Sequence, residues 1–375
     1  MNYDFDKKIN RKNTNCIKWD IVEEGVLPFG IADMDFELAP VIQEALIKRI
    51  EHGVFGYSLE DQELVDTLVD WYNTTYHQET KKEWFVLIPG IVPAFHVCAN
   101  MAKSGVMSIT PNYNMLLEAI EEEKKELVTT KMINQDEHYS LDIEAMEKAW
   151  HEGIDQFMFC NPHNPLGKVY TKQELQELSK FCKKHDMIIV SDEIHCEIIY
   201  EGQHTTMLDV DNYARDHSII LMAPGKTYNM AGLPFAFAII KNDELRDKFK
   251  HTIFMSEPVL LSKVAAKAAY QKGQDWKEQV LDYLRGNRDY VEERLKTLFP
   301  KARYPHLQAT YLMWIDLTDY FDEPAKWILE HAKVSFIGGE HYQGNGYVRV
   351  NIATSRQNIK EAFDRIEEAY KKTHR

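Results

Sequence analysis

Apolar and polar positions along residues 40–240 follow two alternating patterns. Short apolar runs bounded by turn residues are typical of strands, and apolar residues spaced by three or four are typical of helices. The runs at 187–190, 218–222 and 235–240 lack polar alternation, which favours strands buried on both faces of a parallel sheet. Strands are expected at 85–88, 106–109, 126–132, 156–160, 187–190, 218–222 and 235–240. Helices are expected at 41–53, 64–72, 93–101, 115–124 and 143–150. A further helix is expected to start at a capping box formed by Thr171 and Glu174. This succession predicts one open α/β sheet covered by helices.

The pattern changes after residue 241, where long helical stretches predominate. Helices are expected at 243–251, 256–272, 275–298 and 323–332, strands at 311–317 and 347–352, a short extended piece at 334–337, and a last helix opened by a capping box of Thr354 and Gln357. Residues 1–30 show little periodicity and are expected to form an arm. We therefore expect an arm with part of a small domain (1–50), a large domain (51–285) and a smaller α+β domain (286–375).

The acidic composition limits the possible partners. The chain has 59 acidic and 44 basic residues, a net charge of −15, and no Lys/Arg block stands out. Its overall field therefore repels nucleic acid and anionic lipid. No apolar run approaches the ~20 residues of a membrane span. The first residues, which include Asp4, Asp6, Lys7 and Lys8, are unlike a signal peptide. The five cysteines are scattered and form no C-x-x-C pair. We expect a cytoplasmic protein that binds neither nucleic acid nor a membrane.

The stretch 221–233, LMAPGKTYNMAGL, places one lysine at the mouth of an apolar strand. Desolvation there disfavours the ammonium form of Lys226 and makes its amine a usable nucleophile. The sequence Gly225-Lys226-Thr227 also resembles the end of a phosphate loop, but that motif needs a glycine where this chain has Ile220. A nucleotide-binding loop is therefore rejected. A solvated lysine in a strand-to-helix connection is the competing interpretation of this stretch taken alone.

Other polar residues follow neighbouring predicted strands. Ligands of open α/β sheets bind at the carboxyl ends of strands, where the sequence places Gly90, Asn164 and Asp192. Gly90 also opens a helix, whose free N–H groups could bind phosphate. A nucleophilic lysine near a carboxylate is what pyridoxal phosphate requires, because the lysine forms the Schiff base and the carboxylate keeps the pyridine nitrogen protonated. Alternatively, Asp192 could be a helix N-cap or, with Glu193 and His195, a metal ligand, although no second ligand pair with metal spacing is present.

Three segments, in this order, resemble the fold-type I pyridoxal-phosphate enzymes, which form the aspartate aminotransferase superfamily. They are Asn-Pro-His-Asn-Pro at 161–165, Ser-Asp-Glu-Ile-His at 191–195 and Gly-Lys-Thr-Tyr-Asn-Met-Ala-Gly-Leu at 225–233. Shorter matches, such as Ala-Asp-Met-Asp-Phe at 32–36 and Arg-Val-Asn at 349–351, extend nearly end to end. Within the superfamily the chain is similar to the cystathionine β-lyase branch that includes MalY, PatB and cystalysin. The resemblance implies a mainly parallel seven-stranded sheet, a smaller α+β domain, and pyridoxal 5′-phosphate as cofactor.

The resemblance also implies which residues contact the cofactor ring. Lys226 would hold the cofactor and then move the α-proton of the substrate. Asp192 would pair with the pyridine nitrogen, and Asn164 would bind the phenolic oxygen with His195 close by. Tyr113 would stack on the ring, as aromatic side chains do.

The remaining implied roles concern the phosphate and the substrate. The phosphate would be bound by the helix start formed by Gly90, Ile91 and Val92. It would also be bound by Tyr57 of a neighbouring subunit. This arrangement implies a homodimer with shared, catalytically necessary contacts. The substrate would be bound by Arg349, Asp33, Tyr113 and Asn164. Among these, Arg349 would bind the α-carboxylate as a bidentate fork.

Four positions depart from the pattern of the superfamily. Ala223 and Gly225 replace the serines or threonines that many relatives carry before the lysine. Leu166 replaces a frequent threonine. Pro234 occupies a position near which aminotransferases commonly have an arginine that binds the phosphate. Each change removes a hydrogen bond of ~1 kcal/mol or more. Losing two would weaken cofactor binding by about one or two powers of ten, so weakened cofactor retention is expected.

Three functions remain open at this point. The leading hypothesis is α,β-elimination of an L-cysteine S-conjugate such as cystathionine, which yields pyruvate, ammonia and a thiol. An aminotransferase shares the steps up to proton removal, and the catalytic residues do not separate the two reactions; no second arginine for a dicarboxylate stands out. The altered residues around Lys226 also keep open a regulatory protein that binds the cofactor and turns over slowly.

Overall fold

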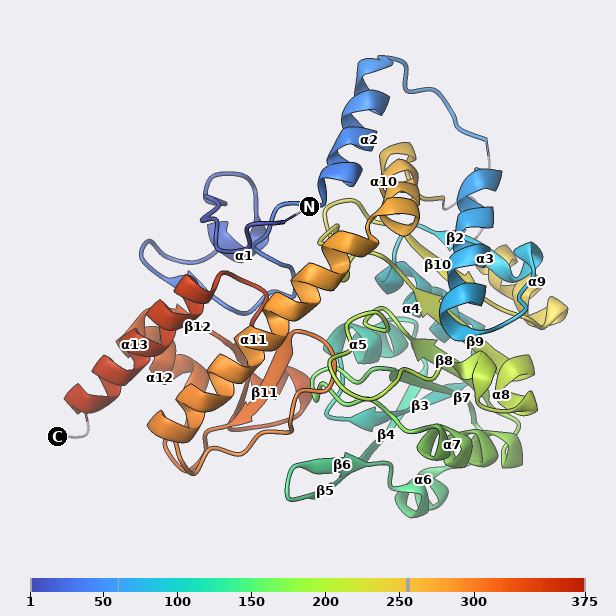
Figure 1. Cartoon of the computed structure of the whole chain (residues 1–375). Coiled ribbons are helices and arrows are strands. Elements are labelled where there is room, and N and C mark those ends of the chain that lie inside the picture. The colour runs from blue at the N-terminus through green and yellow to red at the C-terminus, as the bar shows by residue number, and fades with distance from the viewer. Residues whose placement is uncertain (1, 60, 254–256, 374–375) are drawn as a thin grey trace.

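The larger sheet of the protein has seven strands in the order β2-β10-β9-β8-β7-β3-β4 (Figure 1). The computed structural model describes residues 2–59, 61–253 and 257–373. The strands are β2 (Phe85–Ile88), β3 (Gly105–Thr110), β4 (Glu126–Lys131), β7 (Ile154–Cys160), β8 (Ile188–Asp192), β9 (Ser218–Met222) and β10 (Ala236–Ile239). All seven predicted strands are confirmed, and the sheet is mainly parallel.

One strand direction in this sheet differs from the expectation. β10 runs antiparallel to both β9 and β2, whereas residues 235–240 were expected to form a parallel strand. A parallel return needs a crossover, usually a helix. The connection 223–235 contains only turns, so the chain folds back beside β9 in the opposite direction.

Helices cover both faces of the sheet. One face packs against α4 (Ile91–Met101), α5 (Asn114–Glu122) and α9 (Asp243–Thr252), and the other against α3 (Gln62–Tyr76), α6 (Ile143–Ala149), α7 (Lys172–Lys184), α8 (Asn212–His217) and α10 (Leu260–Lys272). Alternate residues of a strand point to opposite faces; in β9, Ile219 and Leu221 join the first cluster, and Ile220 and Met222 join the second. The absence of polar alternation in the sequence follows from this two-sided burial.

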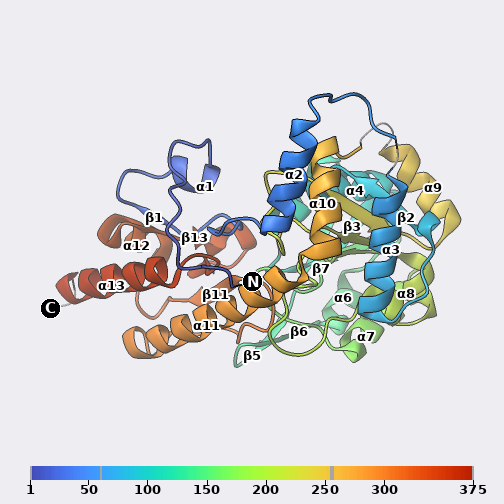
Figure 2. The same ribbon diagram turned by 45° about the horizontal axis from the view of Figure 1, so that its top comes forward.

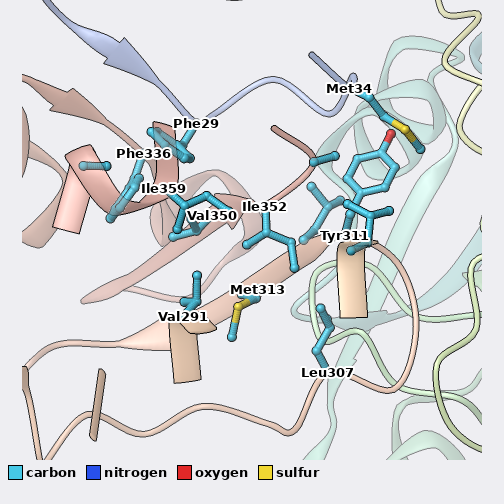
Figure 3. Packing of buried hydrophobic residues seen from close by; sticks show 14 of the residues in the cluster. Phe29, Met34, Val291, Leu307, Tyr311, Met313, Phe336, Val350, Ile352 and Ile359 are labelled. Carbon is cyan, nitrogen blue, oxygen red and sulfur yellow. The ribbon is translucent and has the colours of Figure 1, made fainter. Parts of the chain in front are cut away.

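A smaller sheet and three helices form the second part of the molecule. Its elements are β11 (Leu312–Asp316), β13 (Ile337–Gly338), β14 (Tyr347–Asn351), α11 (Gln274–Leu298), α12 (Pro324–Ala332) and α13 (Arg356–Thr373). β14 lies between β11 and β13 and is antiparallel to both. Figure 3 shows apolar side chains from these elements, such as Met313, Val350 and Ile359, packed in one core. The predicted boundary at residue 285 falls inside α11, and the division into domains stays a prediction.

The N-terminal segment packs into this second core. It contains α1 (Ile17–Asp20) and β1 (Leu27–Pro28), and β1 pairs in parallel with β12 (Val334–Ser335). Phe29 and Met34 are buried in the cluster of Figure 3. Neither α1 nor β1 was predicted, because elements this short show no periodic pattern. The next helix, α2 (Pro40–Glu51), packs beside α10, which also packs on α3 (Figure 2).

Two capping boxes and several short elements show where the sequence predicted local structure and where it did not. The Thr171–Glu174 capping box is confirmed. The second predicted box is wrong by one residue, because Ser355 Oγ, rather than Thr354, accepts from the backbone N–H of Asn358 (3.3 Å). A hairpin of β5 (Ile133–Gln135) and β6 (His138–Ser140) and three short 3₁₀ helices, η1 (Lys82–Trp84), η2 (Met207–Asp209) and η3 (Gly339–Tyr342), were not expected. The predicted helix start at Ser256 lies outside the described residues. Of the helices described, none is both long enough and apolar enough to span a bilayer.

Candidate active site

The predicted site residues gather at one edge of the large sheet. β7, β8 and β9 are adjacent and parallel, so their carboxyl ends meet at the same edge. Asn164 lies in the loop after β7, Asp192 is the last residue of β8, and Lys226 follows β9. β2 ends at this edge too, directly before α4 and its first residue, Ile91. The apolar strand runs of the sequence thus place these groups together.

The Lys226 amine is half-buried and bound to a backbone carbonyl. Its Nζ donates to Ala32 O at 2.6 Å, and the hydroxyl of Tyr311 donates to the same oxygen at 3.1 Å. Burial is the main cause that lowers the pKa of Lys226 to about 8, and the positive charge of Arg349 is the second. The negative charges of Asp33 and Asp192 raise this pKa and offset part of the shift. A lowered pKa increases the fraction of neutral amine near pH 7, which is the nucleophilic form.

The Asp192 carboxyl is buried, and no lysine or arginine among the described residues forms a salt bridge with it. It is 3% exposed and accepts from the backbone N–H of Ile194 (3.2 Å) and from Cys160 Sγ (3.7 Å). Burial raises its pKa to about 7, although these hydrogen bonds and the charge of Lys226 act in the opposite direction. A buried carboxylate of this kind is stabilised by a cation that arrives with a ligand, such as a protonated ring nitrogen.

Asp192 should make the stability of the cofactor-free chain depend on pH. In the folded protein the pKa of Asp192 is about 7, whereas the pKa of a free aspartate is 3.8. A raised pKa stabilises the fold fully below pH 3.8, and this contribution is lost as pH rises through about 7. Urea unfolding at successive pH values should therefore show the wild type losing free energy of unfolding relative to Asp192→Asn across this window. Parallel curves for the two proteins would contradict the assignment.

Three more predicted residues surround this pair. His195 is buried with Nδ1 unpartnered, and burial lowers its pKa well below the usual value, so the ring is neutral near pH 7. Asn164 Oδ1 accepts from Nη1 of Arg349 at 3.3 Å. Tyr113 is half-buried directly before α5, and burial raises its pKa. Unpartnered buried polar atoms in this region fit a polar ligand better than an apolar core.

The start of α4 provides a place for an anion. Gly90 occupies the N-cap position without a capping side chain, and Ile91 and Val92 are the first two helical residues. The first N–H groups of a helix have no acceptor inside it, and the helix dipole favours negative charge there. A Cβ at Gly90 would meet only Pro93 Cδ, at 3.6 Å. The backbone at Gly90 is therefore open to close approach by a phosphate.

Arg349 is a buried guanidinium with no carboxylate bound to it among the described residues. It lies on β14 at 3% exposure, and its Nη2 donates to Gly30 O at 3.1 Å. The guanidinium stacks over the ring of Tyr342 at 4.6 Å, and its Nε has no hydrogen-bond partner in the part of the chain that the structure describes. Burial lowers its pKa. An uncompensated buried arginine is suited to bind the carboxylate of a ligand.

Tyr57 lies apart from the site within one chain, and the Asp33 carboxylate, whose charge acts on Lys226, is held in an ion pair. Tyr57 lies between α2 and α3, in the segment that leaves the upper end of α2 in Figure 1, and is fully exposed. The carboxylate of Asp33 is bound by Arg11, with Nη2–Oδ2 at 2.6 Å and Nη1–Oδ1 at 3.1 Å. Roles for Tyr57 and Asp33 in binding stay predictions.

The alternative metal site at the end of β8 is not assembled. Glu193 turns away from Asp192: its Oε2 bonds His204 Nε2 (2.8 Å), and its Oε1 accepts from Ser191 Oγ (3.1 Å). Across the described ranges, no three His, Cys, Asp or Glu side chains are grouped to hold a metal ion.

Sequence reasoning did not identify the acceptors of the two cationic site residues. The carbonyls of Ala32 and Gly30 bind Lys226 and Arg349, and Tyr311 and Cys160 add contacts to the site. A backbone carbonyl carries no residue-specific signal. Of the segments that supply these two carbonyls, only the one that contains Ala32 was marked in the sequence, by the match at 32–36.

Comparisons with known proteins agree with this geometry. The aminotransferase class I and II model matches residues 24–366. The chain is 31% identical to cystathionine beta-lyase PatB of Bacillus subtilis, over 97% of this chain and 99% of that protein. Cystalysin from Treponema denticola, whose crystal structure contains a pyridoxal 5′-phosphate cofactor, is 30% identical with a TM-score of 0.94 over all of both chains. A PLP-bound putative aminotransferase from Clostridium difficile is 31% identical with a TM-score of 0.93, over 98% of this chain and all of that one. With its strand-end lysine and carboxylate and a model match over most of its length, the chain belongs to the aminotransferase class I and II family.

Proposed function

We propose that the protein is a pyridoxal-phosphate-dependent carbon–sulfur β-lyase, which cleaves L-cystathionine or related cysteine S-conjugates to pyruvate, ammonia and a thiol. The observation that carries the proposal is the pair formed by the desolvated Lys226 amine and the buried, uncompensated Asp192 carboxyl at neighbouring strand ends. The name of PatB, a cystathionine beta-lyase, favours elimination from a thioether among the reactions of this family, and the cofactor of cystalysin supports pyridoxal phosphate as the cofactor of this chain.

The residues of this chain would hold the cofactor at three places. Lys226 would link to its aldehyde carbon, Asp192 would pair with its ring nitrogen, and the N-terminus of α4 would bind its phosphate. Tyr113 and Asn164 would contact the ring. When bound, the cofactor supplies an electron-withdrawing ring that makes the α-proton of the amino acid acidic.

The chain itself would supply orientation and proton transfer. Arg349 would bind the α-carboxylate and so fix the Cα–H bond relative to the site. The Lys226 amine, released when the amino group of the substrate takes its place, would take the α-proton, because its pKa of about 8 leaves part of it neutral near pH 7. The thiol then leaves from Cβ, and hydrolysis of the remaining three-carbon unit gives pyruvate and ammonia.

Incubation with cystathionine and no added keto acid tests the proposal. Formation of pyruvate and a thiol in equal amounts supports a lyase. The alternative is an aminotransferase, favoured by the C. difficile neighbour; its activity would require a keto acid and would leave the carbon–sulfur bond intact. Bound cofactor without either activity over a broad amino-acid panel would instead support a slow regulatory protein.

Arg349→Lys should weaken substrate binding more than catalysis. Lysine keeps the charge but loses the fork, and one charge-assisted hydrogen bond is worth about 1.5–3 kcal/mol. We expect KM for cystathionine to rise by about 10²-fold with kcat within a few-fold of the wild type. Arg303→Lys is the control, because Arg303 makes a comparable fork on the half-exposed rim of the second sheet. Equal effects in both variants would remove Arg349 from the carboxylate site.

Gly225→Ser should improve cofactor retention. A Cβ at Gly225 would meet nothing within 4 Å, so a serine hydroxyl can be accommodated before the lysine. One regained hydrogen bond of ~1 kcal/mol should slow cofactor loss by about five- to tenfold. Dialysis followed by the absorbance of the bound cofactor measures it, with Gly225→Ala as the control. Full retention by the wild type would refute the expected weakening.

Leu166, by contrast, is fully buried in the apolar cluster on one face of the sheet, so a polar residue could not replace it without being buried among apolar side chains.

We also propose a homodimer in which Tyr57 reaches the site of a second copy of the chain. Large apolar side chains are exposed around α2 and the segment that follows it, namely Ile47, Ile50, Val54, Phe55 and Leu59. An exposed apolar patch of this kind is typical of an interface. Mixing inactive Tyr57→Ala and Lys226→Ala chains should restore activity, because a hybrid dimer has one site with both native residues. No recovery in mixed dimers would exclude a shared site.

A further inference from the structure

Five successive backbone carbonyls beneath the site, in residues 30–34, are each bound by a side chain. The donors come from distant parts of the chain: Arg349 to Gly30 O (3.1 Å), Asn351 to Ile31 O (2.6 Å), Lys226 to Ala32 O (2.6 Å), Asn351 and Lys18 to Asp33 O (2.7 and 3.2 Å), and Arg11 to Met34 O (3.0 Å). We call residues 30–34 the carbonyl segment. Two of its donors are the proposed cofactor lysine and carboxylate-binding arginine, so its position fixes where both cations rest.

A cluster of four charges holds the far end of the carbonyl segment. Besides the Asp33 fork, Arg11 Nη1 donates to Asp35 Oδ1 (2.6 Å), and Lys18 Nζ donates to Asp35 Oδ2 (2.8 Å). Trp19 Nε1 also donates to Asp35 Oδ1 at 2.8 Å. The side chain of Lys18 is fully buried and that of Arg11 is one-fifth exposed. Two cations and two carboxylates balance, which is the condition under which buried charges persist.

We propose that Arg11 and Lys18 are positioning residues, which hold the Ala32 carbonyl against the Lys226 amine through the carbonyl segment. The inference rests on the proposed function only in treating that amine as the reactive group. Arg11 and Lys18 bind the carboxylates of Asp33 and Asp35. They also bind the backbone oxygens of Asp33 and Met34, so they fix the segment directly next to Ala32. Arg11 and Lys18, neither of which was predicted as a site residue, thereby control the environment of the nucleophile.

The expected consequence is a change in the protonation of Lys226. A carbonyl at 2.6 Å favours the ammonium form, and the charges that also act on the amine are Asp33, Asp192 and Arg349. Arg11→Lys keeps the charge near Asp33 but cannot make the fork and the bond to Met34 O together. The Ala32 carbonyl should then move, and the pKa of Lys226 should fall by about one unit below its present value.

The experiment measures the reactivity of Lys226 in the full chain freed of cofactor with hydroxylamine. Labelling with fluorodinitrobenzene from pH 6 to 10, with mass spectrometry of the peptide that contains Lys226, gives the pH midpoint of the amine. We expect a midpoint near 8 in the wild type and about one unit lower in Arg11→Lys. The charge-balanced double variant Lys18→Met/Asp35→Asn should shift it in the same direction.

Lys7→Arg is the matched control, because Lys7 forms an exposed pair with Glu37 on the same segment without touching the carbonyl segment. Its midpoint should equal that of the wild type. A midpoint that is unchanged or higher in folded Arg11→Lys overturns the proposal. The measurement reads the amine directly, so a chain that binds no cofactor fails the proposed function yet still tests this inference.

Discussion

Lys226→Ala should lower the rate of cystathionine cleavage by about 10⁴-fold or more, because one residue supplies both the covalent attachment and the proton acceptor. Borohydride reduction of the cofactor-loaded protein should label Lys226 in the wild type, and the variant should carry no covalent cofactor. Activity and the labelled peptide are measured separately.

The matched control for this prediction is Lys248→Ala. Lys248 Nζ also donates to a backbone carbonyl, that of Met101, at 2.8 Å, but it lies on α9 away from the strand ends. Its removal should leave rate and labelling unchanged. A Lys226→Ala protein that keeps more than about a tenth of the wild-type rate is incompatible with this residue as both attachment point and base.

Asp192→Asn should lower the rate by about 10³-fold while the fold is kept. Removing one partner of a buried charge pair costs about 3–5 kcal/mol, which corresponds to about 10²–10⁴ in rate if the pair forms on the reacting ring. The loss should appear mainly in kcat, because the ring loses its electron-withdrawing charge rather than its binding place. Steady-state kinetics with saturating cofactor measure the effect.

Asp316→Asn is the corresponding control. Asp316 is also a buried aspartate at the end of a strand, but it ends β11 and pairs with Arg303. It should change stability without a selective loss of kcat. If Asp192→Asn turns over at the wild-type rate, its carboxylate does not act on the cofactor.

Local sequence patterns predicted most of the fold because burial on both faces of a sheet leaves a direct mark. The runs 187–190 and 219–222 contain no polar residue. Strand β8 then ends at Asp192, and the turn residues Pro224 and Gly225 after β9 precede Lys226. Short elements left no such mark. β1 has two residues and each strand of the β5–β6 hairpin has three, which is too few to show the alternation by which a strand is recognised.

Strand direction and charge pairing were decided by packing instead. The sequence of β10 reads like its parallel neighbours, but only the turn-filled path from β9 makes it antiparallel. In the same way, Asp33 carries the charge expected of a substrate contact, while its oxygens are bound by Arg11. Neither outcome follows from residue type, since both depend on which segments meet.

By itself, the sequence determined the α/β class, the order of the seven large-sheet strands along the chain, and the chemistry at their ends, because strand length and apolar character act locally. The tertiary structure alone decided what the reactive groups touch. Lys226 and its acceptor Ala32 are 194 positions apart, and Arg349 and Gly30 are 319 apart. Contacts over such separations exist only after the two cores have packed, so the resting place of the amine is a property of the fold.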